Sequence, residues 1–415
     1  MAVDAKRAIA ELKELRALTS NDAGAQRVAW TDTWLKAREW FQSKWKGLPV
    51  EHHYDAAGNR WMTLKGGSPR ALLIGSHLDS VPNGGWLDGA LGMLAGLAVL
   101  RRIADEFHGR PPVTIRLVDF ADEEGARFGR SLLGSSAFAG TSSVEADRVR
   151  TDKDGIRLGE ALRRCGVEID RFSEAQREQK DAAAYLELHI EQGPVLESRG
   201  LPLAAVLGTK GVERHAITFF GQEAHSGSTP MNARRDALAA AAKLALEIRA
   251  IAQKHADAVC TIGSVKTFPG IVTALVGRCE VTLDQRALGA NVLATMYHEA
   301  REVSERFARE EKCTVEWSRI WNIEPVPFHP QLIQLCEEAI RETAGESLRL
   351  PSGPLHDAAE VARAGIPTVM MFVQSLNGIS HNKIEDTREE HLELAVAAFD
   401  RLASKVIAFI QNGEK

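Results

Sequence analysis

The sequence contains few cysteines and no long hydrophobic run. The five cysteines are odd in number, scattered and never in CxxC spacing: Cys165, Cys260, Cys279, Cys313 and Cys336. This pattern argues against a disulfide framework and a thiolate zinc site, so we expect reduced thiols. The apolar stretches fall well short of a bilayer span, and the opening segment MAVDAKRAIAELKEL lacks the hydrophobic region of a signal peptide. We therefore expect a cytoplasmic protein with no membrane segment.

A block of lysine and arginine is absent as well. The chain has 51 Lys and Arg against 56 Asp and Glu, a net charge of −5, so it carries no electrostatic footprint for nucleic acid. Hydrophobic residues make up 44% and charged residues 26% of the chain, which is typical of a globular protein. Its 415 residues are too many for one ordinary hydrophobic core and suit two domains.

Strand and helix patterns alternate along the first half of the chain. RWMTL, ALLIGSH, VTIRLVDFA and YLELHI are short apolar runs typical of strands, and Gly89 to Phe107 has the pattern of a helix. This alternation predicts a largely parallel sheet covered by helices, in which functional sites collect at the carboxyl ends of the strands.

From about Gly208 the pattern changes. The strands HAITFFGQ, CTIGSVKTF, RCEVTLDQRAL and CTVEWSRI are interleaved with helices at Asn232 to Ala252 and Asn291 to Glu310, the β-α-β-β-α-β order of a ferredoxin-like domain. After Pro325 the earlier alternation resumes, with IPTVMMFV as a buried strand. We predict an α/β protein whose discontinuous catalytic domain (1–207 and 325–415) has a mostly parallel sheet. A ferredoxin-like α+β domain (208–324) is inserted in it.

Acidic and imidazole side chains gather just after the apolar runs. In LLIGSHLDSVPNGGWLDGALG, His77 and Asp79 would face the same side of an extended strand. Asp79 could then accept the second ring N–H of a metal-bound His77. Asp88 stands in a Gly-rich turn before a helix, where its carboxylate could bridge two ions. HxD alone is more often structural, but a second Asp in this turn makes the pattern strong.

Two adjacent glutamates follow the next strand, in LVDFADEEGARFGRSLLGS. Neighbouring carboxylates repel unless a cation or a proton separates them. One arrangement gives Glu124 to a metal and leaves Glu123 to take a proton from metal-bound water. The alternative is a solvated acidic loop.

Three further histidines complete the candidate set. His189 in LELHIEQGPVLE could supply a second imidazole, with Gln192 as a polar substrate contact. His381 in ISHNKIEDT follows a buried strand, and His356 in LHDAAEVA could contact substrate or support the site. A solitary histidine is more often structural. Together, imidazoles and carboxylates without a thiolate suit catalytic zinc, manganese, cobalt or nickel better than a structural zinc.

The inserted domain adds two candidates. His225, in GQEAHSGSTPMNARRDA, could donate to an oxyanion, and Arg286, in TLDQRAL, could hold a carboxylate with two hydrogen bonds. A solvated loop histidine and a surface arginine are the alternatives.

These segments, in this order from Gly75 to Thr387, resemble the hydantoinase/carbamoylase branch of the M20 metallopeptidase-like amidohydrolases. HIEQGP and GISH separate this branch from the M20 dipeptidases and deacylases. The resemblance implies hydrolysis of the ureido C–N bond of an N-carbamoyl-L-amino acid to amino acid, ammonia and carbon dioxide. Alternatives are an allantoate or ureidoglycolate amidohydrolase, a dipeptidase, and an inactive relative that only binds ureido acids.

The resemblance also implies a role for each candidate. His77 and His189 would hold one divalent ion and Glu124 and His381 a second, with Asp88 bridging, Glu123 as general base and acid, and Asp79 orienting His77. His225 and Arg286 would bind the tetrahedral intermediate and the substrate carboxylate, with Gln192 and His356 as further substrate contacts. The smaller domain would act as a lid and pair two subunits into a homodimer.

Three positions depart from the pattern of this branch. Thr273 stands where relatives carry an Asn that contacts substrate, and Leu355 stands where many have Gly before His356. Trp86 is a bulky residue beside the metal turn. Thr273 and Leu355 lie where recognition of the substrate side chain is expected, so Thr273 is a further candidate substrate contact.

Overall fold

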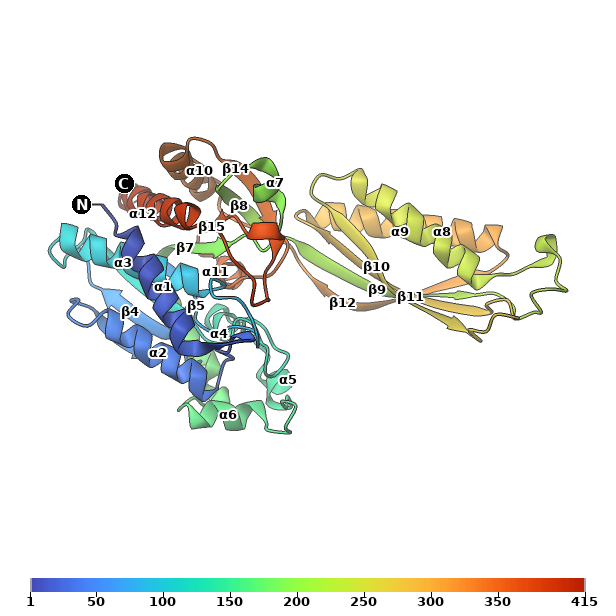
Figure 1. The fold of residues 1–415 in the computed structure, drawn as a ribbon, viewed down its shortest axis with the longest axis horizontal. Coiled ribbons are helices and arrows are strands. Elements are labelled where there is room, and N and C mark those ends of the chain that lie inside the picture. The colour runs from blue at the N-terminus through green and yellow to red at the C-terminus, as the bar shows by residue number, and fades with distance from the viewer. Residues whose placement is uncertain (1, 414–415) are drawn as a thin grey trace. The chain divides into compact units, whose positions relative to one another are not determined.

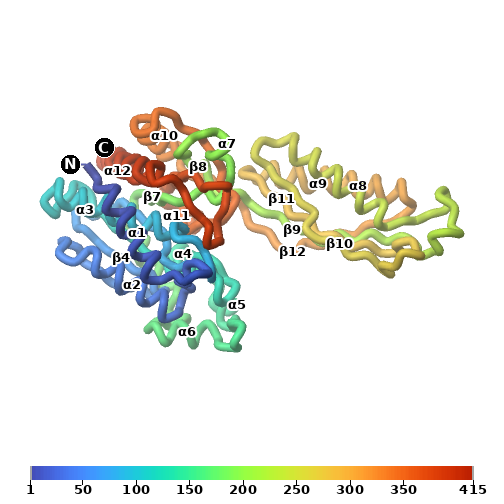
Figure 2. The backbone as a smooth tube through the Cα atoms, in the orientation of Figure 1, coloured from blue at the N-terminus to red at the C-terminus, as the bar shows by residue number. Residues whose placement is uncertain are grey.

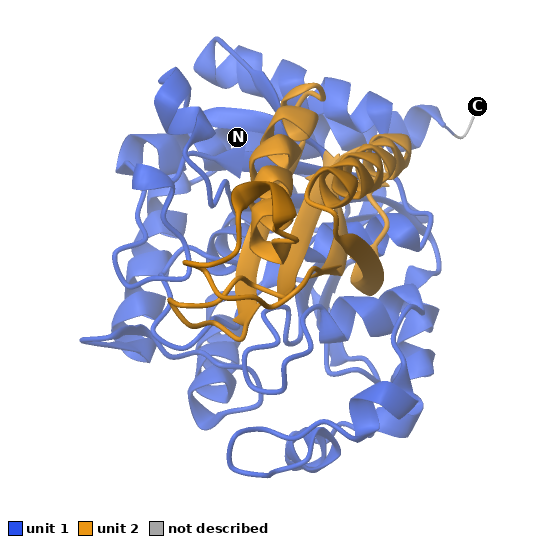
Figure 3. Ribbon diagram, turned by 90° about the vertical axis from the view of Figure 1, so that its right-hand side faces the viewer, with its two compact units in different colours: residues 1–207, 328–415 blue, residues 208–327 orange. Residues whose placement is uncertain are grey.

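The computed structural model describes residues 2–413 and divides into two compact units (Figure 3). Unit 1 is formed by the chain up to Leu207 and from Phe328 onward, and unit 2 is Gly208–Pro327. Unit 2 thus ends at Pro327, three residues beyond residue 324, where the sequence analysis expected the inserted domain to end. Within residues 2–413, no helix has the length and apolar character needed to cross a membrane.

A nine-stranded sheet organises unit 1 (Figure 1). Its strands are β3 (Glu51–Tyr54), β4 (Arg60–Leu64), β5 (Ser68–His77), β6 (Val113–Phe120), β7 (Ala182–Ile190), β8 (Leu203–Thr209), β13 (Val326–Pro327), β14 (Leu348–Ser352) and β15 (Thr368–Val373). The strand order is β13-β8-β15-β7-β5-β6-β4-β3, with β14 paired to β8. A separate two-stranded ribbon joins β1 (Ser20–Asn21) and β2 (Gly24–Ala25).

The prediction of a mostly parallel sheet is wrong, because the sheet is mixed. Strands β15, β7, β5 and β6 run parallel to one another, while β4 and β3 on one side and β8 and β13 on the other pair antiparallel. The four parallel strands are buried along nearly their whole length, as expected for strands covered on both faces. Pairing of His77 with Phe120 and of His189 with Phe372 brings their carboxyl ends to one level.

Helices cover this sheet in groups. They are α1 (Ala5–Thr19), α2 (Asp32–Lys44), α3 (Ala90–Glu106), α4 (Leu133–Ala139), α5 (Val144–Arg148), α6 (Leu158–Arg164), α7 (Val195–Arg199), α10 (Pro330–Ala344), α11 (Asp357–Arg363) and α12 (Glu389–Asn412), with 3-10 turns η1 (Ile169–Gln179) and η3 (Leu376–Gly378). Helices α1 and α12 lie side by side (Figures 1 and 2) and both pack with α3. Helix α12 also packs with α10, whereas α4 packs with α11 and η1. Helix α3 is buried from Ala90 to Ala104, so it lies between the sheet and other helices.

Unit 2 has its own sheet and core. Its elements are β9 (Gly211–Phe220), η2 (Met231–Ala233), α8 (Ala237–Gln253), β10 (Val259–Phe268), β11 (Arg278–Ala287), α9 (Ala290–Glu310) and β12 (Thr314–Ile323). The strand order is β10-β11-β9-β12, and β10 with β11, β11 with β9 and β9 with β12 all pair antiparallel. Buried and less buried side chains alternate along β9 and β11, so the sheet turns one face to the core formed with α8 and α9.

Candidate metal centre and active site

The ends of the four parallel strands place the candidate side chains of unit 1 together. His77 is the last residue of β5, and His189 lies one residue before the end of β7. Glu123 and Glu124 follow β6, and His381 follows β15. Because neighbouring parallel strands end at the same edge of a sheet, side chains far apart in the sequence meet at this edge.

Asp88 lies at the centre of these groups. Its Oδ1 atom is 3.1 Å from Nε2 of His189 and 3.6 Å from Nε2 of His77. Its Oδ2 atom is 3.4 Å from Nε2 of His381, which is itself 3.3 Å from Oε2 of Glu124. Two groups of possible metal ligands therefore share Asp88. We name His77, Asp88 and His189 site A, and Asp88, Glu124 and His381 site B.

Main-chain carbonyls orient the two imidazoles of site A. Nδ1 of His189 lies 2.9 Å from the carbonyl oxygen of Ile190, and Nδ1 of His77 lies 3.1 Å from the carbonyl oxygen of Asp79. Both rings thereby turn Nε2 toward Asp88, and Nε2 of His77 is buried without a hydrogen-bond partner. Such outer hydrogen bonds fix the tautomer and orientation of histidines that bind metal.

The Asp79 carboxylate is expected from the sequence to orient His77, and in the structure it also binds the main chain that follows β6. Its Oδ1 atom is 3.6 Å from Nδ1 of His77, farther than the main-chain oxygen of the same residue. Its two oxygens accept the main-chain N–H groups of Glu123 at 3.3 Å and Glu124 at 3.2 Å. Asp79 therefore connects the end of β5 to the glutamates that follow β6.

The charges in this cluster fit a divalent cation. Burial and the charge of Asp88 raise the pKa of Glu124 to about 7. Burial also raises the pKa of Glu123 well above its ordinary value, although His77 opposes the shift. Burial works against ionisation of Asp88, yet hydrogen bonds with His189 and His381 hold its pKa well below the usual range. Buried carboxylates that repel one another and face imidazole nitrogens form an N/O donor set suited to catalytic divalent metals.

Gly89 allows the turn that carries Asp88 to approach His77. Its φ is +65°, a conformation that favours glycine. A Cβ added at Gly89 would lie 2.4 Å from Cε1 and Nδ1 of the His77 ring. Any larger residue would therefore displace a candidate ligand.

Gln192 and His356 both border the cluster. Nε2 of Gln192 donates to Oδ2 of Asp88 at 2.8 Å. The His356 ring lies 4.4 Å from that of His189, and burial together with the charge of His189 lowers its pKa well below the usual value. A cavity of about 210 Å³ opens over the cluster and is lined by Asp88, Glu123, Glu124, Ser131, His189, Gln192, Pro354, Leu355, His356 and His381.

The remaining candidates belong to unit 2. His225 lies in a loop where its Nδ1 accepts the N–H of Gly227 at 3.1 Å, and the chain beside it pairs with the segment of Thr273. Arg286 stands near the end of β11 and forms an ion pair with Asp284 at 2.8 Å. The structure thus groups the metal-ligand candidates in unit 1 and the proposed oxyanion and carboxylate contacts in unit 2.

The structure adds two residues to the cluster, Ser380 and Glu385. The hydroxyl of Ser380 is 3.0 Å from Oδ2 of Asp88, and a carboxylate oxygen of Glu385 accepts the main-chain N–H of Asp88 at 3.1 Å. Both lie within the segment GISHNKIEDT that the sequence singles out for His381, but nothing in their spacing indicates contact with a turn near residue 88.

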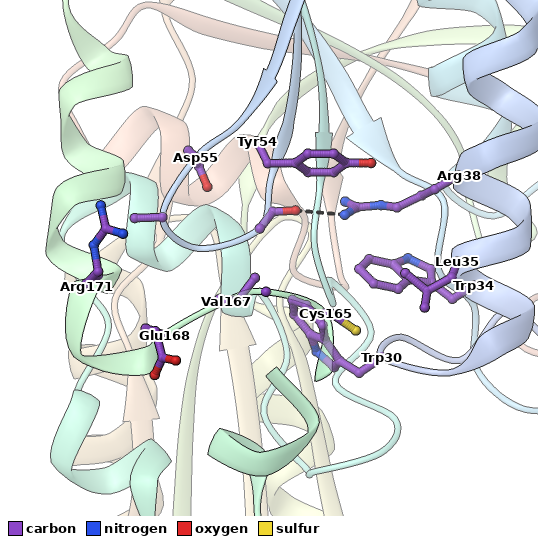
Figure 4. Close-up of a pocket in the computed structure, with 13 residues that line it drawn as sticks. Trp30, Trp34, Leu35, Arg38, Tyr54, Asp55, Cys165, Val167, Glu168 and Arg171 are labelled. Atoms are coloured by element: carbon purple, nitrogen blue, oxygen red, sulfur yellow. Dashed lines mark hydrogen bonds between the residues drawn. The ribbon is translucent and has the colours of Figure 1, made fainter. Parts of the chain in front are cut away.

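A larger cavity of about 410 Å³ lies elsewhere in unit 1 and shares no lining residue with the metal cluster (Figure 4). There Arg38 lies 4.0 Å over the ring of Trp34 and donates to the carbonyl of Gly58 at 2.7 Å. Arg38 also forms a buried ion pair with Asp119 of β6 at 2.6 Å. Arg38 is thereby paired within the protein, and none of the candidate catalytic residues lines this cavity.

Comparison with known proteins accords with this geometry. A model of the Peptidase family M20/M25/M40 matches residues 73–405. The chain belongs to this family. Enzymes of the M20 family use divalent metal ions, and sites A and B supply groups that could hold them.

Among its relatives, an N-carbamoyl-L-amino acid amidohydrolase of Geobacillus stearothermophilus is 37% identical over 372 residues, 88% of this chain and 90% of that protein. An allantoate amidohydrolase of Bacillus subtilis is 31% identical over 390 residues, 93% and 94% of the two chains. The crystal structure of a hydantoinase/carbamoylase family amidase from Burkholderia multivorans matches with a TM-score of 0.86 at 34% identity, covering 97% of this chain and 98% of that one. This M20 protein is accordingly a hydrolase of C–N bonds.

Proposed function

We propose that this M20 hydrolase cleaves the ureido C–N bond of an N-carbamoyl-L-amino acid, releasing the amino acid, ammonia and carbon dioxide. The observation that carries the proposal is the position of Asp88, whose two oxygens face site A and site B, with Glu123 beside them. The relative from Geobacillus stearothermophilus, 37% identical, supports this substrate class.

We further propose that two divalent ions, zinc, manganese, cobalt or nickel, bind per subunit. His77 and His189 would hold one ion, Glu124 and His381 the other, and Asp88 would bridge them. When bound, such ions polarise the substrate carbonyl and lower the pKa of water.

Glu123 is the proposed general base and acid. It lines the cavity, and its Oε2 atom is 3.7 Å from Nε2 of His77. Glu123 takes one proton from water as the water oxygen attacks the ureido carbonyl carbon. It then gives that proton to the departing nitrogen as the first C–N bond breaks. The carbamic acid that is left releases carbon dioxide as its remaining C–N bond breaks, and its nitrogen takes the hydroxyl proton. A carboxyl group whose pKa is raised by burial, as for Glu123, can serve in both directions near neutral pH.

Substrate recognition is assigned to both units. In unit 1, Gln192, His356 and Leu355 line the cavity. In unit 2, we propose that His225 donates to the oxyanion, Arg286 binds the substrate carboxylate and Thr273 contacts the substrate. The element order and strand order of unit 2 support a ferredoxin-like α+β domain. Action of this unit as a lid, and pairing into a cytoplasmic homodimer, remain predictions.

Allantoate or ureidoglycolate hydrolysis is the second candidate function. The Bacillus subtilis allantoate amidohydrolase is 31% identical to this chain, and Arg286 suits any substrate that bears a carboxylate. A dipeptidase fits less well, and an inactive ureido-acid binder is disfavoured because all the candidate ligands and Glu123 are present.

Turnover by the metal-loaded protein separates these functions, followed as ammonia release from the ureido substrates and as appearance of a free amino group from the dipeptide. The substrates to compare are N-carbamoyl-L-amino acids, their D-forms, β-ureidopropionate, allantoate, ureidoglycolate and a dipeptide. We expect turnover of an N-carbamoyl-L-amino acid and none of its D-form. Preference for allantoate or ureidoglycolate would replace the proposed substrate, and absence of turnover with two ions bound would overturn the proposed function.

A further inference from the structure

Glu385 connects two segments that carry proposed metal ligands. Its side chain is buried, with 2% of the residue exposed. Its Oε1 atom accepts the main-chain N–H groups of Leu87 at 3.0 Å and Asp88 at 3.1 Å. Its Oε2 atom lies 3.1 Å from the hydroxyl of Ser380, the residue before His381. One carboxylate thus holds the turn of Asp88 and the loop of His381, which are separated by almost three hundred residues along the chain.

Ser380 extends this connection to the ligand side chain itself. Its hydroxyl is 3.0 Å from Oδ2 of Asp88 and accepts a hydrogen bond from Nε2 of Gln192 at 2.9 Å. The Ser380 hydroxyl has one proton, which it can donate to Asp88 or to Glu385. When the Asp88 carboxylate binds metal, the hydroxyl donates to Glu385 instead. Glu385 is then the acceptor that keeps Ser380 in place.

The turn around Gly85 is shaped to receive this carboxylate. A Cβ added at Gly85 would lie 2.0 Å from Cδ and from Oε1 of Glu385. Contacts this short do not occur, so a side chain at Gly85 would force Glu385 away from its two main-chain donors.

Sites A and B differ in how much they depend on such a connection. Two of the three residues of site A, His77 and His189, belong to strands β5 and β7 and are held by the sheet, and the third is the shared Asp88. In site B, Asp88, Glu124 and His381 all lie outside the strands and helices. The positions of Asp88 and His381 relative to each other therefore depend on side-chain hydrogen bonds between their segments.

We propose that Glu385 is a positioning residue that joins the Asp88 turn to the His381 loop and thereby sets the affinity of site B for its divalent ion. The inference rests on the proposed function, since it takes two ions per subunit. Glu385 touches neither the substrate nor the reacting atoms in this role. It acts through Ser380 and through the main chain of Leu87 and Asp88.

The test is the Zn²⁺ content and affinity of the intact protein, measured by elemental analysis and by competition with a chromogenic chelator. The variants are Glu385→Gln, which removes the charge and one acceptor, and Gly85→Ala, which displaces the carboxylate without removing it. We expect both to keep one tightly bound Zn²⁺ and to bind the second about 10- to 100-fold more weakly, the usual effect of losing a partner that orients a ligand.

Asp152→Asn is the matched control. Oδ1 of Asp152 accepts two main-chain N–H groups, of Asp154 at 3.0 Å and Ile156 at 2.9 Å, and its Oδ2 accepts Nε of Arg127 at 3.0 Å. The Asp152→Asn variant loses the same kind of hydrogen bonds as Glu385→Gln, but none of the hydrogen-bond partners of Asp152 is a candidate metal ligand. We expect this variant to keep both ions at wild-type affinity, and thermal unfolding with chelator present shows that each variant folds.

The outcomes separate the two proposals. If wild-type protein binds two Zn²⁺ ions and Glu385→Gln and Gly85→Ala do the same with unchanged affinity, the role of Glu385 is overturned and the proposed function stands. Equal weakening of both ions, or the same loss in Asp152→Asn, would show a general structural effect and would also overturn it. If wild-type protein binds fewer than two ions, the proposed binuclear centre fails, and the role of Glu385 fails with it.

Discussion

Three residues in or next to the metal cluster have positive φ angles, which residues other than glycine rarely adopt. Asp122, Gln192 and His381 have φ values of 60°, 59° and 53°, each of which costs about 1–3 kcal/mol for a residue other than glycine. Hydrogen bonds keep two of them in place: Nε1 of Trp30 donates to Asp122 at 2.7 Å, and the main-chain N–H of Gln192 donates to Ser375 at 3.0 Å. The strain lies beside Glu123 and at a proposed ligand, where the position of a side chain matters most.

Glu123→Gln tests the general base directly. Gln cannot take a proton from water, but it has nearly the same shape, and Glu123 is in neither site A nor site B. We expect the variant to keep the wild-type metal content and to lose turnover by at least about 100-fold, the lower end of the contribution of general acid–base catalysis. Ammonia release and elemental analysis of the same sample provide the measurement. Full activity would show that another group moves the proton.

Gly89→Ala tests the close approach of the Asp88 turn to His77. A side chain there meets both the φ of +65° and a His77 ring 2.4 Å away. Gly365→Ala is the control, since Gly365 has a φ of +82° and nothing within 4 Å of its Cβ position. We expect the control to lose about 1–2 kcal/mol of unfolding free energy from strain alone. Gly89→Ala should lose more and bind metal more weakly, as denaturant titration and chelator competition would measure. Equal losses in both would contradict contact with His77.

The packing of helix α3 on the sheet sets the position of Asp88 relative to the strands. The helix begins directly after Asp88 and Gly89 and packs on β5, β6 and β7. Gly92 allows this close packing, since a Cβ there would lie 2.5 Å from the carbonyl oxygen of Leu188 and 2.7 Å from Cβ of Ser76. The distance between Asp88 and the strand histidines thus depends on a contact between a helix and two strands.

Gly92→Ala should therefore move α3 away from β5 and β7. We expect a loss of unfolding free energy of about 1–3 kcal/mol, the usual cost of overpacking, together with weaker metal binding. Gly159→Ala in helix α6 is the comparison, because its Cβ would make only ordinary contacts of 3.9 Å or more. That variant should gain about 0.5–1 kcal/mol, since Ala is favoured over Gly within helices. Chemical denaturation measures both, and a stabilised Gly92→Ala would refute close packing at this point.

The whole molecule has separate hydrophobic cores in its two units. Every proposed metal ligand lies in unit 1, so bound metal should stabilise that unit alone. The tryptophans divide unevenly: Trp317 and Trp321 lie in unit 2, and the other six of the eight lie in unit 1. Tryptophan fluorescence therefore reports mainly on the unit that would hold the metal.

Chelation should lower the unfolding temperature that tryptophan fluorescence records. A ligand present at a thousand times its Kd stabilises the folded state by about 4 kcal/mol, and its removal takes that contribution away. In calorimetry, we expect one of two transitions to shift with chelator and the transition of unit 2 to stay in place. Restored Zn²⁺ should reverse the shift. A fluorescence transition that chelator does not move would contradict metal binding in unit 1.

Much of this architecture can be predicted from local pattern. The helix expected at Gly89 to Phe107 is α3 (Ala90–Glu106), and the one expected at Asn291 to Glu310 is α9 (Ala290–Glu310), since apolar periodicity and glycine boundaries are local signals. Family membership could be predicted because its motifs are short, ordered segments, and the matched family model agrees.

Strand direction could not be predicted in this way. The runs RWMTL and ALLIGSH look alike in sequence, yet β4 joins the sheet antiparallel and β5 belongs to its parallel centre. A buried strand needs apolar side chains in either direction, so composition does not distinguish the two pairings. Only the path of the chain between the strands decides which one forms.

The sequence by itself determined which side chains are available for chemistry: the imidazoles, the paired glutamates and the aspartate of the Gly-rich turn. The tertiary structure alone decided that the two oxygens of Asp88 face different histidines, that main-chain carbonyls orient His77 and His189, and that Glu385 joins two distant segments. The physical reason is the range of the interactions. Motif spacing reflects local backbone geometry, whereas these hydrogen bonds form only after the sheet has brought the ends of four strands together.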